Sequence, residues 1–337
     1  MVEMEKLLSA ICNKLPEGLT FEPSDTDLTD CFPATAKGDE EEIIPINVKE
    51  PEKQKPILIT PKYPIESQIT AIDSTNFTLG QIPDGLVGAV RASIITKAPN
   101  RTSHSLEKYG PYLVPITNQN KDLVYRNAHK AIYAKETGAS APDCLQTLDR
   151  IRNFLERYIQ AEVVKSCKNS LILIDGSLIG DTVGDPGFVL KKIMADAVSN
   201  HNSIVAISKS TRLTLQQNQK SILSLLDGVP GPCYIGNIKK HISQNSDRYY
   251  GEVYVARLTP LGEPFRVDIP PNAPLSHDEI FSQVAGLAGD YGYPEELKLA
   301  HMTCVLSCIE IMELQSAAIV LHDLSIKEEL RTKIFPL

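Results

Sequence analysis

The chain has 337 residues, of which 42% are hydrophobic and 23% charged, with 42 acidic and 34 basic side chains. This composition excludes wholesale disorder, and at about 150 residues per domain the length predicts two domains or one large one. The net charge of −8 argues at first sight against a nucleic-acid partner. No run of 18 apolar residues occurs and the N-terminus lacks an apolar core, so we expect neither a membrane span nor a secretory signal.

The first 67 residues differ in composition from the rest. Periodicity predicts a short amphipathic helix over 3–14. Segment 22–55 then holds ten acidic and four basic residues, a net charge of −6, and five prolines fall between Pro23 and Pro56. We expect an exposed, irregular arm with one short strand at 43–48. The predicted division is therefore an N-terminal extension, 1–67, and a main domain, 68–337.

From residue 68 onward, apolar patterns predict strands first and interleaved helices later. The predicted strands are 69–73 (followed by a turn at 74–76), 85–96, 171–175, 203–208, and a hairpin of 249–258 with 263–269. The predicted helices are 123–137, 142–165, 191–199, 213–226, 277–287 and 294–318. This order is typical of an α/β fold with a mixed central sheet and flanking helices.

The seven cysteines are an odd number and include no C-x-x-C pair. They indicate free thiols in a reducing compartment, so we expect a cytoplasmic protein. Cys304 and Cys308 stand one helical turn apart and, with His301, form one possible metal site. Two small apolar residues on a buried helix face are the simpler interpretation.

Two predicted strands end in aspartate, at Asp73 and Asp175. Acidic residues at the ends of buried strands lie at the sheet edge where α/β proteins bind ligands. Two such carboxylates repel each other unless a divalent cation lies between them, and carboxylate oxygens suit Mg²⁺ and Mn²⁺. The alternative is that both merely begin turns. Helix 142–165 offers Glu156, at the edge of its apolar stripe, or Glu162, near the middle, as a third ligand.

Motifs for other chemistries are absent from the sequence. It contains no P-loop, no G-x-G-x-x-G after a strand, no G-x-S-x-G and no H-E-x-x-H. A P-loop nucleotide hydrolase and the common hydrolase triad are therefore disfavoured.

An ordered series of segments resembles the NurA nuclease family of archaea and some bacteria. The series covers about residues 68–309 and comprises AIDST (71–75), FLERY (154–158), LILIDGSL (171–178), VAISKSTRL (205–213) and GYPEELKLAH (292–301). The resemblance implies a ribonuclease H-like core and an Mn²⁺-dependent enzyme, a single-strand endonuclease and 5′-to-3′ exonuclease on DNA. It also implies a homodimer that acts with a HerA-type hexameric translocase in DNA end resection and double-strand break repair.

The resemblance also assigns site residues. The family's first aspartate falls on Asp73, its helix glutamate on Glu156, with Glu162 as a rival, and its Asp-Gly aspartate on Asp175. One departure is Ser74, where the family often has glycine. The remaining matches are Lys209, Tyr293 and His301.

A two-metal mechanism follows as a hypothesis. Asp73, Glu156 and Asp175 would hold two Mn²⁺ ions, with Mg²⁺ as an alternative, and His301 would be a further ligand or a proton donor. Lys209 would neutralise a phosphate oxygen and Tyr293 would contact a phosphate or base. Other basic and aromatic residues offered for DNA contact are Lys191, Lys192, Arg212, Lys239, Lys240, Arg248, Tyr249 and Tyr250.

Two further functions remain open on the sequence alone. Besides a nuclease, these are a catalytically weak structural adaptor of a translocase ring and a metal-dependent phosphatase of small molecules. The net charge excludes none of these, because −6 of the −8 lies in segment 22–55. The other residues carry only −2, including the proposed metal carboxylates, so the acidic total does not exclude DNA.

Overall fold

The computed structural model describes residues 15, 19–24, 46–49, 54–133, 135, 137–180, 187–289 and 291–326. The expected helix at 3–14 and most of the acidic arm at 22–55 lie outside these residues. Of the strand expected at 43–48, the described part is β2 (Ile46–Val48).

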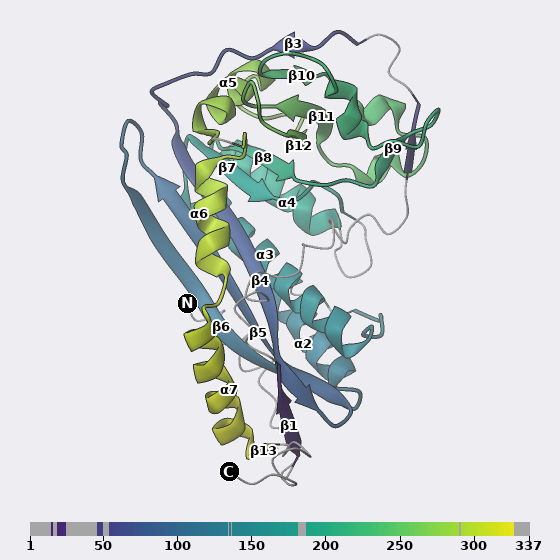
Figure 1. Ribbon diagram of the computed structural model, residues 1–337, viewed down its shortest axis with the longest axis vertical. Coiled ribbons are helices and arrows are strands. Elements are labelled where there is room, and N and C mark those ends of the chain that lie inside the picture. The colour runs from purple at the N-terminus through teal and green to yellow at the C-terminus, as the bar shows by residue number, and fades with distance from the viewer. Residues whose placement is uncertain are drawn as a thin grey trace, which may run out of the picture.

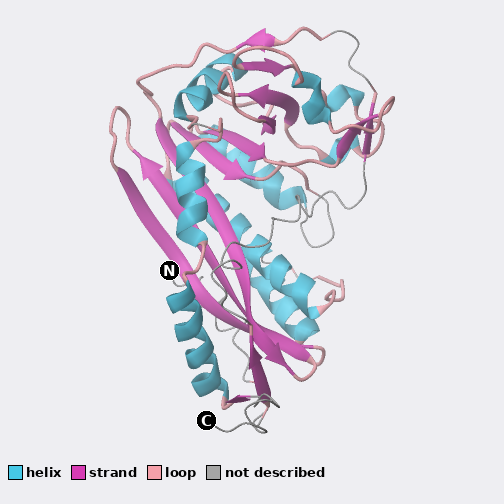
Figure 2. Cartoon of the chain, viewed as in Figure 1, coloured by secondary structure: helices cyan, strands magenta, loops and turns pink. Residues whose placement is uncertain are grey.

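The described chain folds around one mixed sheet with helices on both faces, which confirms the predicted fold class (Figures 1 and 2). Its main path runs in the order β13-β1-β4-β7-β8-β12-β11-β10-β3, and β5 and β6 extend it from β4. Strands β4, β7 and β8 are parallel to one another, whereas β12, β11, β10 and β3 alternate in direction.

The strands of this sheet are β1 (Thr20–Pro23), β3 (Ile57–Leu58), β4 (Gln68–Ile82), β5 (Gly85–Lys97), β6 (His104–Thr117), β7 (Ser170–Asp175), β8 (Ser203–Ser208), β10 (Cys233–Ile235), β11 (Glu252–Arg257), β12 (Pro264–Ile269) and β13 (Ser325–Ile326). Strand β2 pairs in parallel with β9 (Leu213–Leu215) in a separate ribbon. The α-helices are α2 (Lys121–Tyr133), α3 (Cys144–Ser166), α4 (Gly187–Ser199), α5 (His277–Leu287), α6 (Glu295–Cys304) and α7 (Cys308–His322).

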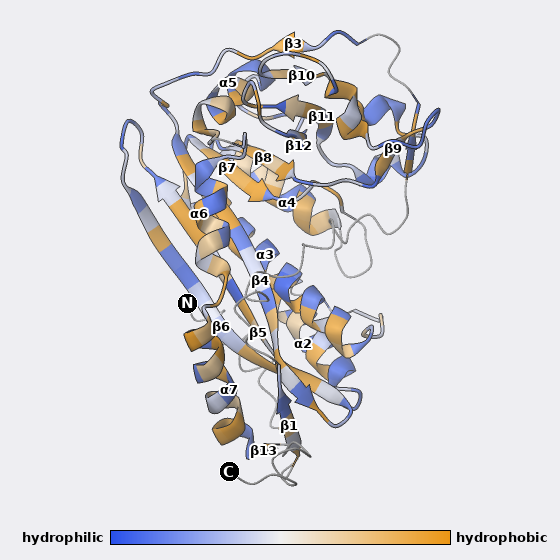
Figure 3. Ribbon diagram, in the orientation of Figure 1, coloured by the Kyte–Doolittle hydropathy of each residue, from blue (hydrophilic) through white to orange (hydrophobic). Residues whose placement is uncertain are grey.

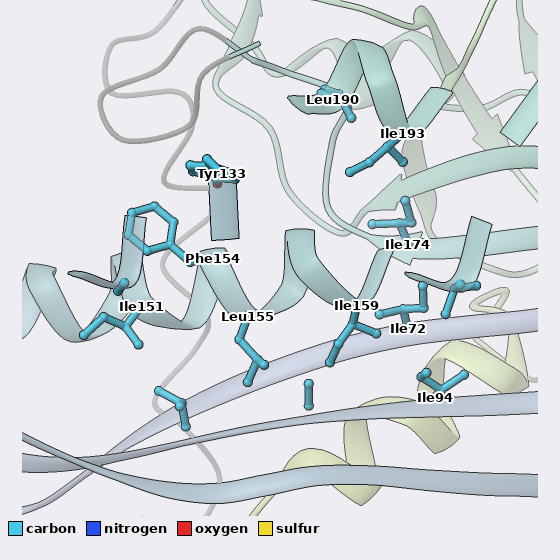
Figure 4. Packing of buried hydrophobic residues seen from close by; sticks show 14 of the residues in the cluster. Ile72, Ile94, Tyr133, Ile151, Phe154, Leu155, Ile159, Ile174, Leu190 and Ile193 are labelled. Atoms are coloured by element: carbon cyan, nitrogen blue, oxygen red, sulfur yellow. The ribbon is translucent and has the colours of Figure 1, made fainter. Parts of the chain in front are cut away.

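Alternation along the central strands divides the core into two layers. Ile72 and Ile174 point to one face, where they pack with residues of α2, α3 and α4 (Figure 4). Ala71 and Leu173, one residue earlier, belong to the opposite layer under α5 and α6. Because both faces are covered, β7 and β8 read as continuous apolar runs in the sequence. The same alternation decides which helix each polar side chain at the strand ends will meet.

Three predicted elements differ in the structure. The expected turn at 74–76 is wrong: β4 continues to Ile82, and the Ser74 and Asn76 side chains hydrogen-bond to α3. The expected helix at 213–226 is wrong: the segment forms β9 and then a 3₁₀ turn, Ile222–Leu226. The expected helix at 294–318 is two helices, because Ser307 begins α7 with a capping box.

The α6–α7 region, Glu295–His322, is long and apolar enough to pass for a membrane span by length and composition alone. This is weak evidence, since the break after Cys304 divides the stretch and α6 packs on the sheet. Helix α7 is different, with apolar residues on several sides and few of them buried (Figure 3). Its exposed apolar side chains are Ile309, Met312, Val320 and Leu321.

Candidate metal centre

Strand pairing brings the two predicted aspartates together. Strands β4 and β7 are parallel, with Ile72 opposite Ile174, so Asp73 and Asp175 follow on adjacent strands. Both lie one residue beyond that pair and therefore face the α6 layer. Asp73 is buried, and Asp175 is half-buried at the end of β7.

Helix α6 supplies the third member of the group. Its first turn follows Pro294, and Glu295 and Glu296 lie at the positive end of the helix dipole. One to two turns later, His301 Nδ1 lies 2.8 Å from Asp73 Oδ2. Cys304, a further turn on, donates its thiol to the Asp73 carbonyl at 3.0 Å and so holds the helix against β4. From the sequence, Cys304 was expected to be either a metal ligand or a small apolar residue on a buried helix face.

Asp73, Asp175 and His301 each offer one ligand atom, and these atoms lie within 4.8 Å of one another. Among the described residues this is the group of histidine, cysteine and carboxylate side chains that is spaced to hold a metal ion. Cys304 and Cys308 are not part of it. Carboxylate oxygens and an imidazole nitrogen are both common ligands of divalent metals.

Electrostatics at Asp175 also fit a bound cation. Burial raises the pKa of Asp175, and the negative charge of Asp73 raises it further, while Lys209 and the Tyr293 hydroxyl act in the opposite direction. The hydrogen bond to Asp73 raises the pKa of His301. A buried pair of like charges is stabilised by a divalent ion, so these residues fit a metal.

Lys209 and Tyr293, two of the residues named from the sequence, lie at the edge of this group. Lys209 follows β8 and its Nζ lies 2.6 Å from Asp175 Oδ2. The same ammonium lies 4.7 Å from the centroid of the Tyr293 ring. The Tyr293 hydroxyl also lowers the pKa of Asp175, against the effect of burial. A cation and a phenol thus converge on the carboxylate that the sequence placed at the end of β7.

Glu156 lies next to the centre but outside the three-residue group. Its Oε2 accepts hydrogen bonds from Ser74 Oγ at 2.5 Å and from Arg152 at 3.3 Å, and its Oε1 accepts one from Gln160 at 3.0 Å. Burial raises the pKa of Glu156, with Arg152 and Ser74 opposing the shift. Alternation explains its position, because Ser74 faces α3 whereas Asp73 faces α6.

The rival Glu162 lies on the surface. Its side chain is 51% exposed and pairs with Lys165 at 2.9 Å. The predicted stripe, centred on Leu148 to Ile159, had placed Glu162 near its middle. Instead the buried face of α3 continues through Gln160, Val163 and Val164, and Glu162 lies outside it.

Several residues of the site were missed in the sequence. Ser74 was assigned to a turn, and nothing in the pattern marks Arg152 or Gln160 as partners of a carboxylate. Arg152 stands one turn before Glu156, an i,i+4 spacing that is common on solvated helices. Only the pairing of β4 with α3 shows that these polar groups are partly buried together.

The fold and the site together define a mixed α/β protein with a candidate divalent-metal centre at a sheet edge. The model of the NurA domain family matches residues 67–306. The chain therefore belongs to the NurA family, as the sequence resemblance had indicated.

A solved structure agrees at the level of the fold. The crystal structure of the NurA nuclease from Sulfolobus solfataricus is similar with a TM-score of 0.51 and 16% identity, covering 79% of this chain and 87% of that one. A second crystal structure, of NurA, matches with a TM-score of 0.34 and 12% identity over 73% of this chain and 85% of that chain. No curated protein sequence matches the chain.

Proposed function

We propose that this protein is a metal-dependent deoxyribonuclease that hydrolyses phosphodiester bonds. The observation that carries the proposal is the convergence of Asp73, Asp175 and His301 within 4.8 Å. The family supports it, and so does the similar Sulfolobus structure, which is that of a nuclease. We propose Mn²⁺, with Mg²⁺ as the alternative, as the cofactor, in a two-ion site that Glu156 completes.

In this mechanism a bound metal supplies Lewis acidity toward the phosphate and its attacking water. The protein's own residues do the rest. Asp73 and Asp175 would hold the metal, together with His301 or, at a second ion, Glu156. The Lys209 ammonium would neutralise a non-bridging phosphate oxygen, since it already lies next to the Asp175 carboxylate.

His301 and Tyr293 would act at the leaving group. This role of His301 is the alternative to metal binding, and its raised pKa favours the protonated imidazole that the role requires. A protonated histidine can transfer its proton to the departing 3′ oxygen. Tyr293, whose ring lies next to the Lys209 ammonium, would position the scissile phosphate by a hydrogen bond.

We also propose that the enzyme is a single-strand endonuclease and a 5′-to-3′ exonuclease. It would act in the cytoplasm, in DNA end resection and double-strand break repair. The test is an assay of the pure protein on single- and double-stranded DNA with Mn²⁺ or with EDTA. Degradation that requires metal and is lost in both Asp73→Ala and Asp175→Ala supports the proposal. Full activity in a folded Asp73→Ala, Asp175→Ala double variant would refute it.

For partners, we propose a homodimer and a HerA-type hexameric translocase. Helix α7 supports a protein partner, because Ile309, Met312, Val320 and Leu321 are exposed on one helix. An apolar helix is ordinarily covered. Light scattering after size exclusion should give a dimer that Ile309→Glu with Val320→Glu dissociates. If the chain leaves DNA intact but raises the ATPase rate of a co-purified translocase, it is the structural adaptor instead.

A further inference from the structure

The loop that follows Asp175 is tied to a second segment of the chain. Leu178 and Gly180 pair with residues 248–250: the Tyr250 amide donates to the Leu178 carbonyl at 2.8 Å, and the Gly180 amide donates to the Arg248 carbonyl at 3.0 Å. The Arg248 side chain also donates from Nε to the Gly180 carbonyl at 3.5 Å. Segment 248–250 is thereby held against the residues that follow Asp175.

Two adjacent tyrosines in this segment have different environments. The Tyr249 ring is buried, and the fully buried Arg266 guanidinium lies 5.1 Å from its centroid. The Tyr250 ring is only partly buried, and the ammonium of Lys191, on α4, lies 5.2 Å from its centroid. Tyr249 therefore belongs to the core, whereas Tyr250 holds a surface cation.

Gly180 makes this arrangement possible. A Cβ at this position would lie 2.6 Å from Cε2 of Tyr250 and 3.0 Å from the Cα of Gly187, where α4 begins. Without a side chain, the loop brings the Tyr250 ring and the start of α4 together. The Tyr250 ring that Lys191 approaches and the Arg248 side chain therefore both lie next to Gly180.

The distance to the reaction centre suits a nucleic-acid strand. Gly180 is five positions after Asp175, so their Cα atoms are at most about 18 Å apart. At about 3.4 Å per nucleotide of a helically stacked strand, Gly180 lies within about five nucleotides of Asp175. Lys191 is exposed, and the Arg248 guanidinium has further N–H donors besides Nε.

We propose that Lys191 and Arg248 form a binding subsite for a backbone phosphate of single-stranded DNA, a few nucleotides from the cleaved bond. Tyr250 is its positioning residue, because its ring orients the Lys191 ammonium. The inference rests on the proposed nuclease function and extends it to a second contact with the substrate. Phosphate contacts are independent of sequence, so the subsite sets affinity and register rather than base preference.

The test is binding of the full chain to a fluorescent 20-nucleotide single strand, measured by anisotropy in EDTA over a salt series. For Lys191→Ala, the slope of log Kd against log salt should fall by about 0.7, the value for one phosphate contact on a single strand. Tyr250→Leu should weaken binding at low salt about two- to five-fold, the range for an exposed cation–π contact. Lys168→Ala is the matched control, because this exposed lysine precedes β7, at the opposite end from Asp175.

Two oligonucleotides of unlike sequence should show equal losses. Cleavage of the 20-mer should fall relative to hydrolysis of bis(p-nitrophenyl) phosphate, a diester that has no phosphate besides the scissile one. Unchanged slope and Kd in Lys191→Ala, or a loss that depends on base sequence, would overturn the subsite. A wild-type protein that binds the strand but never cleaves it with Mn²⁺ defeats the nuclease proposal instead, and the salt slope still decides the subsite.

Discussion

Replacing Asp175 by asparagine should stabilise the metal-free protein and at the same time remove its response to Mn²⁺. The carboxylates of Asp73 and Asp175 lie within 4.8 Å of each other. Burial and this neighbouring charge raise the pKa of Asp175, so its ionised form costs folding free energy near neutral pH. Asparagine keeps the shape of the side chain and removes the charge.

The separation gives the size of the effect. Two unit charges 4.8 Å apart repel by about 3.5 kcal/mol at an effective dielectric constant of 20. The substitution also loses the ion pair with Lys209, whose side chain is 46% exposed, and such a pair contributes at most about 1 kcal/mol. Because the charge of His301 also favours ionised Asp175, we expect a net gain of about 1–2 kcal/mol in the free energy of unfolding.

The assay is urea unfolding at pH 7 in EDTA and again with Mn²⁺. A ligand at 100 times its Kd adds about 2.7 kcal/mol to the wild type, and Asp175→Asn should show little of this. The gain in EDTA should also disappear at acidic pH. As the pH falls through the raised pKa of Asp175, the wild-type side chain becomes neutral as well.

Glu162→Gln is the matched control, because it neutralises an exposed carboxylate on α3. It should change stability by less than about 0.5 kcal/mol and leave the Mn²⁺ response intact. If Asp175→Asn is less stable than wild type in EDTA, or if Mn²⁺ stabilises both proteins equally, the two carboxylates are not the metal centre described above.

Three further substitutions test other parts of the structure. Glu310→Gln should destabilise the fold by about 2 kcal/mol, because the buried Arg91 guanidinium loses its charged partner at 2.5 Å. Since Arg91 lowers the pKa of Glu310 to about 2, the wild-type advantage should persist at pH 5 and be lost as the pH falls from about 4.5 toward 2, as urea midpoints would show. Lys209→Met should lower kcat on DNA about 100-fold or more but retain metal-induced stabilisation, because it contacts Asp175 without being a metal ligand; an unchanged kcat would contradict its role. Gly85→Ala should cost about 1–3 kcal/mol in thermal or urea unfolding, since its Cβ would lie 2.1 Å from a backbone oxygen of β6.

The sequence predicted the centre of the sheet well, because burial on both faces leaves little ambiguity. Strands β7 and β8 were predicted to within a residue, and so was helix α5, which begins with a Ser276 capping box. The hairpin of β11 and β12 followed from its turn and β-branched residues. In these segments local propensity and tertiary packing favour the same structure.

Predictions failed where tertiary contacts override local pattern. Ser74 and Asn76 look like turn residues, yet their side chains bond to α3 and the strand continues. Strand β6 was missed because residues 104–108 are exposed and mostly polar and because Pro111 and Pro115 lie within it. The break in the last long helix depends on Ser307 and Glu310, a capping motif hidden inside an apolar run.

The residues of the candidate site also fall into two groups, those that the sequence pattern predicts and those whose position depends on tertiary contacts. Asp73 and Asp175 were predictable because parallel neighbouring strands align their ends, and His301 follows from the helix that covers that face. The position of Glu156 depends on the opposite face, where a single step along β4 exchanges Asp73 for Ser74. The Ser74 hydroxyl ties Glu156 to the α3 side, in competition with a metal on the α6 side. Ser74→Gly, by removing that bond, is thus the substitution that shows whether Glu156 contributes to Mn²⁺ affinity.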